Sequence, residues 1–430
     1  MLRVRWLDLA NVIRAKGVVL PERGAADDPA ALRTELDRAV SITRAVYAMP
    51  VTADEIIPAT GLFCDHDLNL RPDWSTLHAL PYAPGHAAVM TDMFDGDAPW
   101  ALCPRTFLRR MTATAAAAGL AVRMGVELEF VLFRTDSDGT LVQADGTLFA
   151  QESAFDIDHG FADDLVADLT AQGVQVAQVH AESAGGQWEV SLQHRDPLTC
   201  ADEIVVARQT IHAAARRHGL VASFLPLIAP EVVASAMHVH ISFASGADGD
   251  GFGEAGWWAM AGILDHLPAL TAITAPTPMS FERFRPHYWA GAYVGWGLAN
   301  KEMPLRVVSA PSVAPRDVEY KALDATANPY LAFGAILAAA CDGVARRADL
   351  PAEVSGDPGL LTPEQRAVAG IVPLPATLSE ALDELATDSV LREAWGDELH
   401  QTYQAFKRYE ADALSKLDFD DRRQLTLERY

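Results

Sequence analysis

Two pairs of polar side chains are spaced two residues apart between apolar neighbours. Glu127 and Glu129 form the first pair, and His238 and His240 form the second. A β-strand places residues i and i+2 on one face, so each pair should point in one direction while its apolar neighbours face the core. Two adjacent carboxylates repel each other and are costly to desolvate, and a bound cation relieves both effects.

A third segment, residues 182–189, adds two more carboxylates around a Gly-rich turn. Glu182 precedes the turn, and Glu189 follows it in a run of alternating apolar and polar residues that is typical of a strand. Any one of these segments could be the solvated face of a half-buried sheet. Together they predict a metal site, because carboxylate-rich ligand sets with an imidazole suit Mg²⁺ or Mn²⁺.

Composition excludes several classes of partner. The 430 residues contain 34 basic and 58 acidic side chains, a formal net charge of −24. Such a surface repels nucleic-acid phosphates and anionic membranes, so we expect neither as a partner. The four cysteines form no C-x-x-C pair, no stretch approaches the roughly 18 apolar residues of a membrane span, and no signal peptide is evident. We therefore expect a reduced, cytoplasmic protein.

The hydrophobic patterns predict two domains of α+β type. A β-hairpin is expected over residues 1–25, followed by a helix from Pro29 to about Met49. A turn-rich stretch at 95–99 suggests a boundary between an N-terminal domain, 1–98, and a C-terminal domain, 99–430. The other expected elements are strands at 122–133 and around 238, and helices at 104–119, 162–172, 201–218, 256–270, 329–346, 378–386 and 388–416.

These segments, in this order, resemble the glutamine synthetase family of the bacterial type I kind over nearly the whole chain. The matching segments are 125–130, 182–189, 237–240, 296–300, Arg306 and 319–332. The resemblance implies a small N-terminal β-grasp-like domain and a large catalytic domain with a curved antiparallel sheet. It also implies a homo-oligomer, a dodecamer of two stacked hexameric rings in which a neighbour completes each site.

The resemblance further implies ATP and two or more divalent cations, Mg²⁺ or Mn²⁺. The expected metal ligands are Glu129, Glu182 and Glu189 for one cation and Glu127, His238 and Glu319 for the other. Glu129 and His238 should also contact the substrates. Arg306 matches an arginine that contacts the transferred phosphate, and His240 and Ser242 lie where the family binds nucleotide. Lys301 and Lys321 stand where the family usually has arginines, and we expect them to be catalytic with Arg306.

The departures from the family pattern concern the amine. The stretch 58–62 lacks the aspartate that helps to bind ammonium, and Trp289 replaces a flap glutamate that accepts the ammonium proton. A tryptophan suits an organic amine through packing or cation–π contact. Relatives that join glutamate to amines, polyamines or ethanolamine share it. The resemblance therefore favours an ATP-dependent ligase that makes γ-glutamyl amides.

The acid site departs as well. Arg283 matches the arginine that binds the α-carboxylate of glutamate, but the loop 231–236 lacks the family's Asn-Gly pair, and Asp317 stands where an arginine is usual. Glutamate or a similar small acid is the expected substrate. Two alternatives stay open: an ordinary glutamine synthetase that uses ammonia, and a catalytically silent oligomer. All the expected metal-ligand positions hold a suitable residue. This disfavours the catalytically silent oligomer, since unpaired buried carboxylates are costly.

Overall fold

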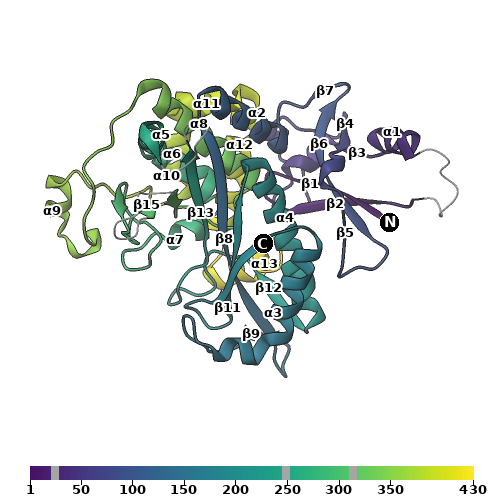
Figure 1. Ribbon diagram of the computed structural model, residues 1–430, viewed down its shortest axis with the longest axis horizontal. Coiled ribbons are helices and arrows are strands. Elements are labelled where there is room, and N and C mark those ends of the chain that lie inside the picture. Colours follow the sequence, from purple (N-terminus) through teal and green to yellow (C-terminus); the bar gives the residue numbers. More distant parts are fainter. Residues whose placement is uncertain (21–28, 245–251, 309–316) are drawn as a thin grey trace.

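The structure, a computed structural model, describes residues 1–20, 29–244, 252–308 and 317–430 and contains two sheets (Figure 1). The first has the order β2-β1-β6-β4-β3, with β5 and β7 on β6. Its strands are β1 (Leu2–Leu7), β2 (Ile13–Val18), β3 (Ser41–Thr43), β4 (Asp67–Pro72), β5 (His78–Ala79), β6 (Ala87–Asp95) and β7 (Ala98–Pro99). The predicted hairpin is confirmed, because β1 and β2 pair antiparallel.

The helix predicted to reach Met49 is wrong at its C-terminal end. Helix α1 (Pro29–Ala39) stops ten residues earlier and packs on β4. The following Ser41-Ile42-Thr43 forms β3, which pairs with β4, and a 3₁₀ turn covers Arg44–Ala48. β-Branched residues favour strands, and here the pairing with β4 overrides the helical pattern.

The second sheet carries the predicted ligand segments and has the order β10-β11-β8-β13-β16-β15-β14, with β9 and β12 on β8. Its strands are β8 (Ala121–Thr135), β9 (Leu141–Gln143), β10 (Val176–Ala181), β11 (Gln187–Arg195), β12 (Leu220–Ser223), β13 (Met237–Ala244), β14 (Trp296–Leu298), β15 (Leu305–Val308) and β16 (Asp317–Tyr320). Every pair is antiparallel except β14 with β15. The predicted α+β class and antiparallel sheet are confirmed.

The helices after β7 are α2 (Pro104–Ala117), α3 (Ser153–Ala171), α4 (Pro197–Arg217), α5 (Gly253–Asp265), α6 (Leu267–Thr274), α7 (Pro278–Glu282), α8 (Pro329–Arg346), α9 (Pro363–Val368), α10 (Leu378–Thr387), α11 (Ser389–Trp395), α12 (Asp397–Ser415) and α13 (Phe419–Thr426). Several of them pack on this sheet, whereas α9 lies apart from it at the left of Figure 1. Helix α4 packs on β8, β11 and β12, and α5 packs on β13.

Two predicted helices are each divided in two. The helix expected over 256–270 is α5 and α6, because Pro268 in the first turn of α6 cannot donate the hydrogen bond that would continue α5. The helix expected over 388–416 is α11 and α12, because Gly396 adopts a φ of 79° and starts a new helix. The remaining predicted helices are present, and α3 begins nine residues before its predicted start.

The two sheets share one buried core. Buried hydrogen bonds also join them: Asn11 Nδ2 donates to the Ala325 carbonyl at 3.0 Å, and Asn328 Nδ2 donates to the Asp8 carbonyl at 3.0 Å. The chain passes from one sheet to the other between Pro99 and Ala121. The division into domains at residue 98 stays a prediction. Within the described residues, no helix has the length and apolar character that crossing a membrane requires.

Candidate functional site

The register of the second sheet places the predicted ligands opposite one another. On β8, Glu129 lies opposite Glu189 of β11, and Glu127 lies opposite His238 of β13. On the outer side of β11, His180 of β10 lies opposite Glu189. Side chains directly opposite each other on antiparallel strands have Cβ atoms about 5 Å apart. The carboxylates and imidazoles on these neighbouring strands therefore form one continuous cluster on the same face of the sheet.

The other side of β13 extends this cluster. His240 lies opposite Glu319 of β16, and Glu319 lies opposite Arg306 of β15. The predicted core-facing neighbours Leu128 and Val239 are fully buried. The strands therefore divide their residues between core and site as the alternating pattern predicts.

The cluster lines a cavity of 480 Å³, which we call the catalytic cavity. The predicted site residues that line it are Glu127, Glu129, Glu182, Glu189, His238, Arg283, Trp289, Lys301, Arg306, Glu319 and Lys321. Segments far apart in the sequence thus meet in one space, as the resemblance implies.

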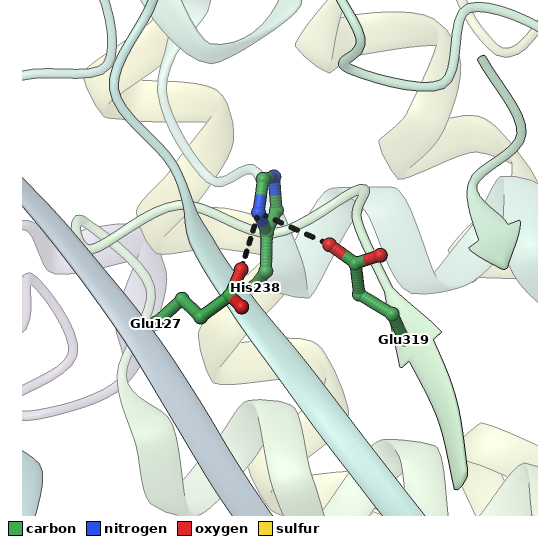
Figure 2. A group of neighbouring side chains, drawn as sticks. All are labelled: Glu127, His238 and Glu319. Atoms are coloured by element: carbon green, nitrogen blue, oxygen red, sulfur yellow. Dashed lines mark hydrogen bonds and ion pairs between the residues drawn. The ribbon is translucent and has the colours of Figure 1, made fainter. Parts of the chain in front are cut away.

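One half of the cluster consists of Glu127, His238 and Glu319 (Figure 2). The His238 Nδ1 atom lies 3.4 Å from Glu127 Oε2 and 3.3 Å from Glu319 Oε1. Lys321 Nζ lies 3.2 Å from Glu319 Oε1, and Arg306 Nε donates to Glu319 Oε2. Burial raises the pKa of Glu319, but Lys321, His238 and Arg306 outweigh it and lower the pKa to about 2. This half holds its carboxylates ionised without a metal.

The other half consists of Glu129, Glu182, Glu189 and His180. His180 Nε2 lies 3.3 Å from Glu182 Oε1, and its Nδ1 lies 3.8 Å from Glu189 Oε1. Burial, and next the charges of Glu182 and Glu189, raise the pKa of Glu129 well above its usual range. Burial and the charge of Glu127 raise the pKa of Glu189 to about 7.

No Lys or Arg of the described residues forms an ion pair with the three carboxylates of this second half. Glu129 Oε2 accepts hydrogen bonds from Gln187 Nε2 at 3.1 Å and from the Ala236 backbone N at 2.9 Å, so its carboxylate is fixed in place. A set of buried, mutually repelling carboxylates with one imidazole nearby fits a hard divalent cation such as Mg²⁺ or Mn²⁺.

His240 lies between the catalytic cavity and an adjoining cavity of 510 Å³. Its Nδ1 is 2.9 Å from Asp317 Oδ1 and its Nε2 is 3.1 Å from Glu127 Oε1. Burial lowers the pKa of His240, but hydrogen bonds with Asp317 and Glu127 outweigh it and raise the pKa to about 10, so His240 is a cation at neutral pH. Both cavities are lined by Glu127 and Gln178. Ser242 lines neither cavity, and its nucleotide contact stays a prediction.

Arg283 is a buried cation without a carboxylate partner among the described residues. It is 1% exposed, and its one hydrogen bond to protein runs from Nη2 to the Lys321 carbonyl at 3.0 Å. Its Nε and Nη1 atoms have no partner in the described part of the chain. Burial lowers the pKa of this guanidinium. A buried, unpaired guanidinium in a cavity wall is suited to bind an anionic group of a ligand.

Trp289 lies on a loop at the opposite wall. It is 46% exposed and lines the catalytic cavity with Tyr288. His287 and Trp289 adopt left-handed φ values of 68° and 53°, which are uncommon for side chains of this size. His287 secures the loop, since its Nδ1 lies 2.8 Å from Asp357 Oδ2 and its backbone N donates to Glu302 Oε2 at 3.2 Å.

Sequence reasoning missed some residues of the cavity. His180 lines the cavity and stands two residues before Glu182, the same spacing that revealed the other pairs. Gln187, which orients Glu129, likewise stands two residues before Glu189. Phe149, whose ring lies 5.7 Å from the His180 ring, carries no sequence signal because it comes from an irregular segment.

Comparisons with known proteins agree with this geometry. A family model described as the catalytic domain of glutamine synthetase matches residues 101–423. The chain is 40% identical over 386 residues to gamma-glutamylpolyamine synthetase GlnA3 of Streptomyces coelicolor, covering 86% of this chain and 82% of that protein. It is 33% identical over 362 residues to a glutamine synthetase of Halobacterium salinarum, covering 80% of each.

Solved structures show the same fold. A crystal structure of a glutamine synthase homologue superposes with a TM-score of 0.85 at 29% identity, covering 100% of this chain and 98% of the other. The ADP complex of GmaS superposes with a TM-score of 0.81 at 25% identity, covering 98% and 96%. The matched catalytic-domain model spans the whole carboxylate cluster. The chain therefore belongs to the glutamine synthetase family, whose members are ATP-dependent ligases.

Proposed function

We propose that the protein joins glutamate, or a similar small acid, to an organic amine at the expense of ATP. The observation that carries this proposal is the composition of the catalytic cavity, where a carboxylate-rich cation site, the buried Arg283 and the aromatic Trp289 face one space. The 40% identity to a gamma-glutamylpolyamine synthetase supports an amine larger than ammonia.

The reaction has two steps. A side-chain carboxylate oxygen of the acid attacks the γ-phosphorus of ATP, and ADP leaves. The lone pair of the neutral amine nitrogen then attacks the carbonyl carbon of the acyl phosphate. The C–N bond forms, the C–O bond to phosphate breaks, and the leaving phosphate takes up the proton that the nitrogen loses. When bound, Mg²⁺ or Mn²⁺ neutralises charge on the phosphates, and the two halves of the carboxylate cluster are its candidate ligands.

Protein side chains assist at defined places. The cations of Arg306 and Lys321 reach the cavity beside Glu319, and Lys301 adds a third, so they can stabilise charge on the transferred phosphoryl oxygens. Arg283 binds the second carboxylate of the acid from the cavity wall. The adjoining cavity at His240 takes the ATP phosphates.

Trp289 and Tyr288 form the amine side of the cavity. Their rings can pack on alkyl groups and attract a cationic nitrogen by cation–π contact. No carboxylate occupies position 289, where the family's flap glutamate stands, and this disfavours ammonia as the amine.

The test is phosphate release from ATP with Mg²⁺, glutamate and a panel of amines that includes ammonia. We expect turnover with an organic amine, little with ammonia, and none with Glu129→Ala. Trp289→Ala should lower kcat/KM for that amine by about tenfold, the size of one cation–π contact, with Leu298→Ala as an exposed apolar control. Turnover with ammonia alone contradicts the proposal.

Ordinary glutamine synthetase is the second candidate, and the 33% identity to the Halobacterium enzyme favours it. The same panel separates the two candidates. Activity with glutamate and ammonia that Trp289→Ala leaves intact would establish the second.

We also propose that the protein is cytoplasmic, has domains at 1–98 and 99–430, and assembles as two stacked hexameric rings. Light scattering of the purified protein tests the assembly. A mass about twelve times the 46.4 kDa of one chain is expected, and a monomer contradicts it.

A further inference from the structure

A separate cavity of 450 Å³ is lined by residues of α4, of the β1–β2 hairpin, of the segment 50–54 and of the end of the chain. It shares no lining residue with the catalytic cavity or the cavity at His240. An adjoining hollow of 340 Å³ is lined by the same Gln209 and Arg216 of α4. We call the larger space the α4 cavity. Its volume suits a small metabolite.

Arginines dominate the charged lining of the α4 cavity. They are Arg14, Arg208, Arg216 and Arg429, against the two carboxylates of Asp54 and Glu428. Arg14 is paired with Asp8 at 2.5 Å. Arg216 and Arg429 are exposed, and neither forms an ion pair within the described part of the chain. A concave surface with excess positive charge is the opposite of the protein as a whole, whose net charge is −24.

Arg208 has few partners in the fold: its guanidinium carbon lies 5.4 Å from the centre of the Phe224 ring, and the Asp8 carboxylate favours its charge without forming an ion pair with it. Arg208 is 2% exposed, and its one hydrogen bond to protein runs from Nη1 to the Asn11 carbonyl at 3.2 Å. Its Nε has no partner among the described residues, and no carboxylate there pairs with it. Burial lowers the pKa of the guanidinium to about 10, so it remains charged at neutral pH. A buried charge without a counterion is costly.

Arg283, in the wall of the catalytic cavity, is likewise a buried arginine with unpaired nitrogens and no ion pair among the described residues. Residues 208, 209, 212 and 216 lie on one face of α4, because residues four apart are neighbours on a helix. His212 on this face has a pKa lowered to about 3 by burial, so it is neutral and adds a polar ring without charge. The helix therefore presents a buried cation and an exposed cation to one space.

We propose that the α4 cavity binds a small organic anion with a carboxylate or phosphate group. Arg208 supplies the buried counterion, and its planar guanidinium can donate two hydrogen bonds to either group. Arg216 and Arg429 contribute charge from the exposed rim. The net charge of the chain attracts no long polyanion, so the ligand is a small molecule.

The test measures binding by calorimetry without ATP, acid or amine. The probes are inorganic phosphate and succinate, with sodium chloride at equal ionic strength as reference. Arg208→Met should lower the affinity for the probe by about tenfold or more, because a charged hydrogen bond is lost. Arg216→Gln should lower this affinity several-fold. Probe binding that Arg306→Gln removes belongs to the catalytic cavity, and binding that persists in Arg306→Gln but falls in Arg208→Met belongs to the α4 cavity. Arg38→Gln, exposed on α1, should leave all of this binding unchanged.

The two probes distinguish a phosphate ligand from a carboxylate ligand. Absence of binding of both at millimolar concentration overturns the proposal, as does equal affinity in Arg208→Met and the wild type. The ligand-free Arg208→Met variant should melt close to the wild type, because it loses a buried charge that forms no ion pair together with the contact of that charge with the Phe224 ring. If that variant does not fold, Arg208→Lys and Arg216→Gln decide, and unchanged affinity in both overturns the site. Ligase activity plays no part in this readout.

Discussion

The carboxylates of the catalytic cavity differ in how their charge is balanced. Glu127 and Glu319 lie beside imidazole and cationic groups, which hold their pKa values low despite burial. Glu129 and Glu189 lie beside other carboxylates, and burial with this repulsion raises their pKa values. The half of the cluster that contains Glu129 and Glu189 is the one that depends on a cation.

Metal affinity should therefore depend on pH. The metal binds the ionised carboxylates, but below about pH 7 Glu189 keeps its proton in the metal-free protein. Mn²⁺ affinity should rise between about pH 6 and pH 8, by up to tenfold per pH unit for each proton released. Calorimetric titration in buffers of different ionisation enthalpy measures both the affinity and the proton count.

Two variants check the assignment. Glu189→Gln should reduce the number of protons released by about one and make the pH dependence less steep, the remainder coming from Glu129. Glu319→Gln should weaken binding without changing the proton count, because Glu319 is ionised throughout this range. The stability of the metal-free protein should change in the opposite direction. A carboxyl with a raised folded-state pKa stabilises below its unfolded pKa, and this contribution is lost as pH rises through about 7. A Mn²⁺ affinity independent of pH contradicts the prediction.

Arg283 should affect the acid substrate rather than the fold. Arg283→Met should raise KM for the acid about 10- to 100-fold, the loss of a charged hydrogen bond of about 1.5–3 kcal/mol. The melting temperature should change little, since the variant removes a buried charge that forms no ion pair but also leaves the buried Asp324 carboxyl without the nearby Arg283 cation. Steady-state kinetics and thermal denaturation measure the two effects. Arg285→Gln is the matched control, because Arg285, like Arg283, donates a side-chain hydrogen bond to a backbone carbonyl, that of Pro230. A melting temperature several degrees lower would assign Arg283 a packing role instead.

At the scale of elements, the period-two pattern was sufficient to predict which side chains share a face. Glu127 with Glu129 and His238 with His240 do so, because a strand has no other geometry. The pattern could not predict that β13 lies between β8 and β16, since neighbouring strands in this sheet are far apart in the sequence. Only the family resemblance predicted that the ligands on β8, β13 and β16 belong to one site.

Helix ends were predicted less well, for two different reasons. Gly396 and Pro268 are local signals that mark the breaks, and closer reading of the sequence could have found them. The end of α1 at Ala39 is set by the pairing of β3 with β4, a tertiary contact that no local pattern contains. The left-handed loop at Trp289 is equally invisible, because neither His287 nor Trp289 favours that conformation.

The packing of α5 on α8 depends on two glycines. A Cβ at Gly343 would lie 2.1 Å from the Trp258 carbonyl oxygen, and a Cβ at Gly262 would lie 2.2 Å from the Ala339 carbonyl oxygen. Both contacts are with backbone atoms, which cannot rotate away. The helices can approach this closely only without side chains at these positions.

Gly343→Ala should therefore destabilise the protein, although alanine is the better helix former by about 1 kcal/mol. We expect a loss of about 1–3 kcal/mol from the forced separation of the helices. Urea unfolding followed by circular dichroism measures it. Ala345→Gly, at an exposed position of the same helix, should cost only the propensity term of about 1 kcal/mol. A more stable Gly343→Ala variant contradicts the close contact.

At the scale of the whole molecule, the N-terminal sheet is held on the catalytic part by groups that also shape α8. Asn328, which is 4% exposed, caps α8 by accepting hydrogen bonds from the backbone N of Tyr330 at 3.1 Å and of Leu331 at 3.4 Å. Its Nδ2 donates to the Asp8 carbonyl just after β1. One side chain thus caps the first turn of a helix and joins the two sheets.

Asn328→Ala should destabilise both parts together. The lost cap costs about 1 kcal/mol, and the lost hydrogen bond to the Asp8 carbonyl, which keeps its bond from the Asn11 backbone N at 3.1 Å, costs about 1 kcal/mol more. Thr377→Ala removes an exposed cap of α10 and should cost the cap alone. Because the two sheets share one core, hydrogen exchange in urea should show β1 and β6 opening with β8 and β13 in a single transition, in the wild type and in both variants. If β1 and β6 exchange well before β8, the N-terminal sheet is an independent unit, and the effect of Asn328→Ala on β8 should shrink to that of a cap.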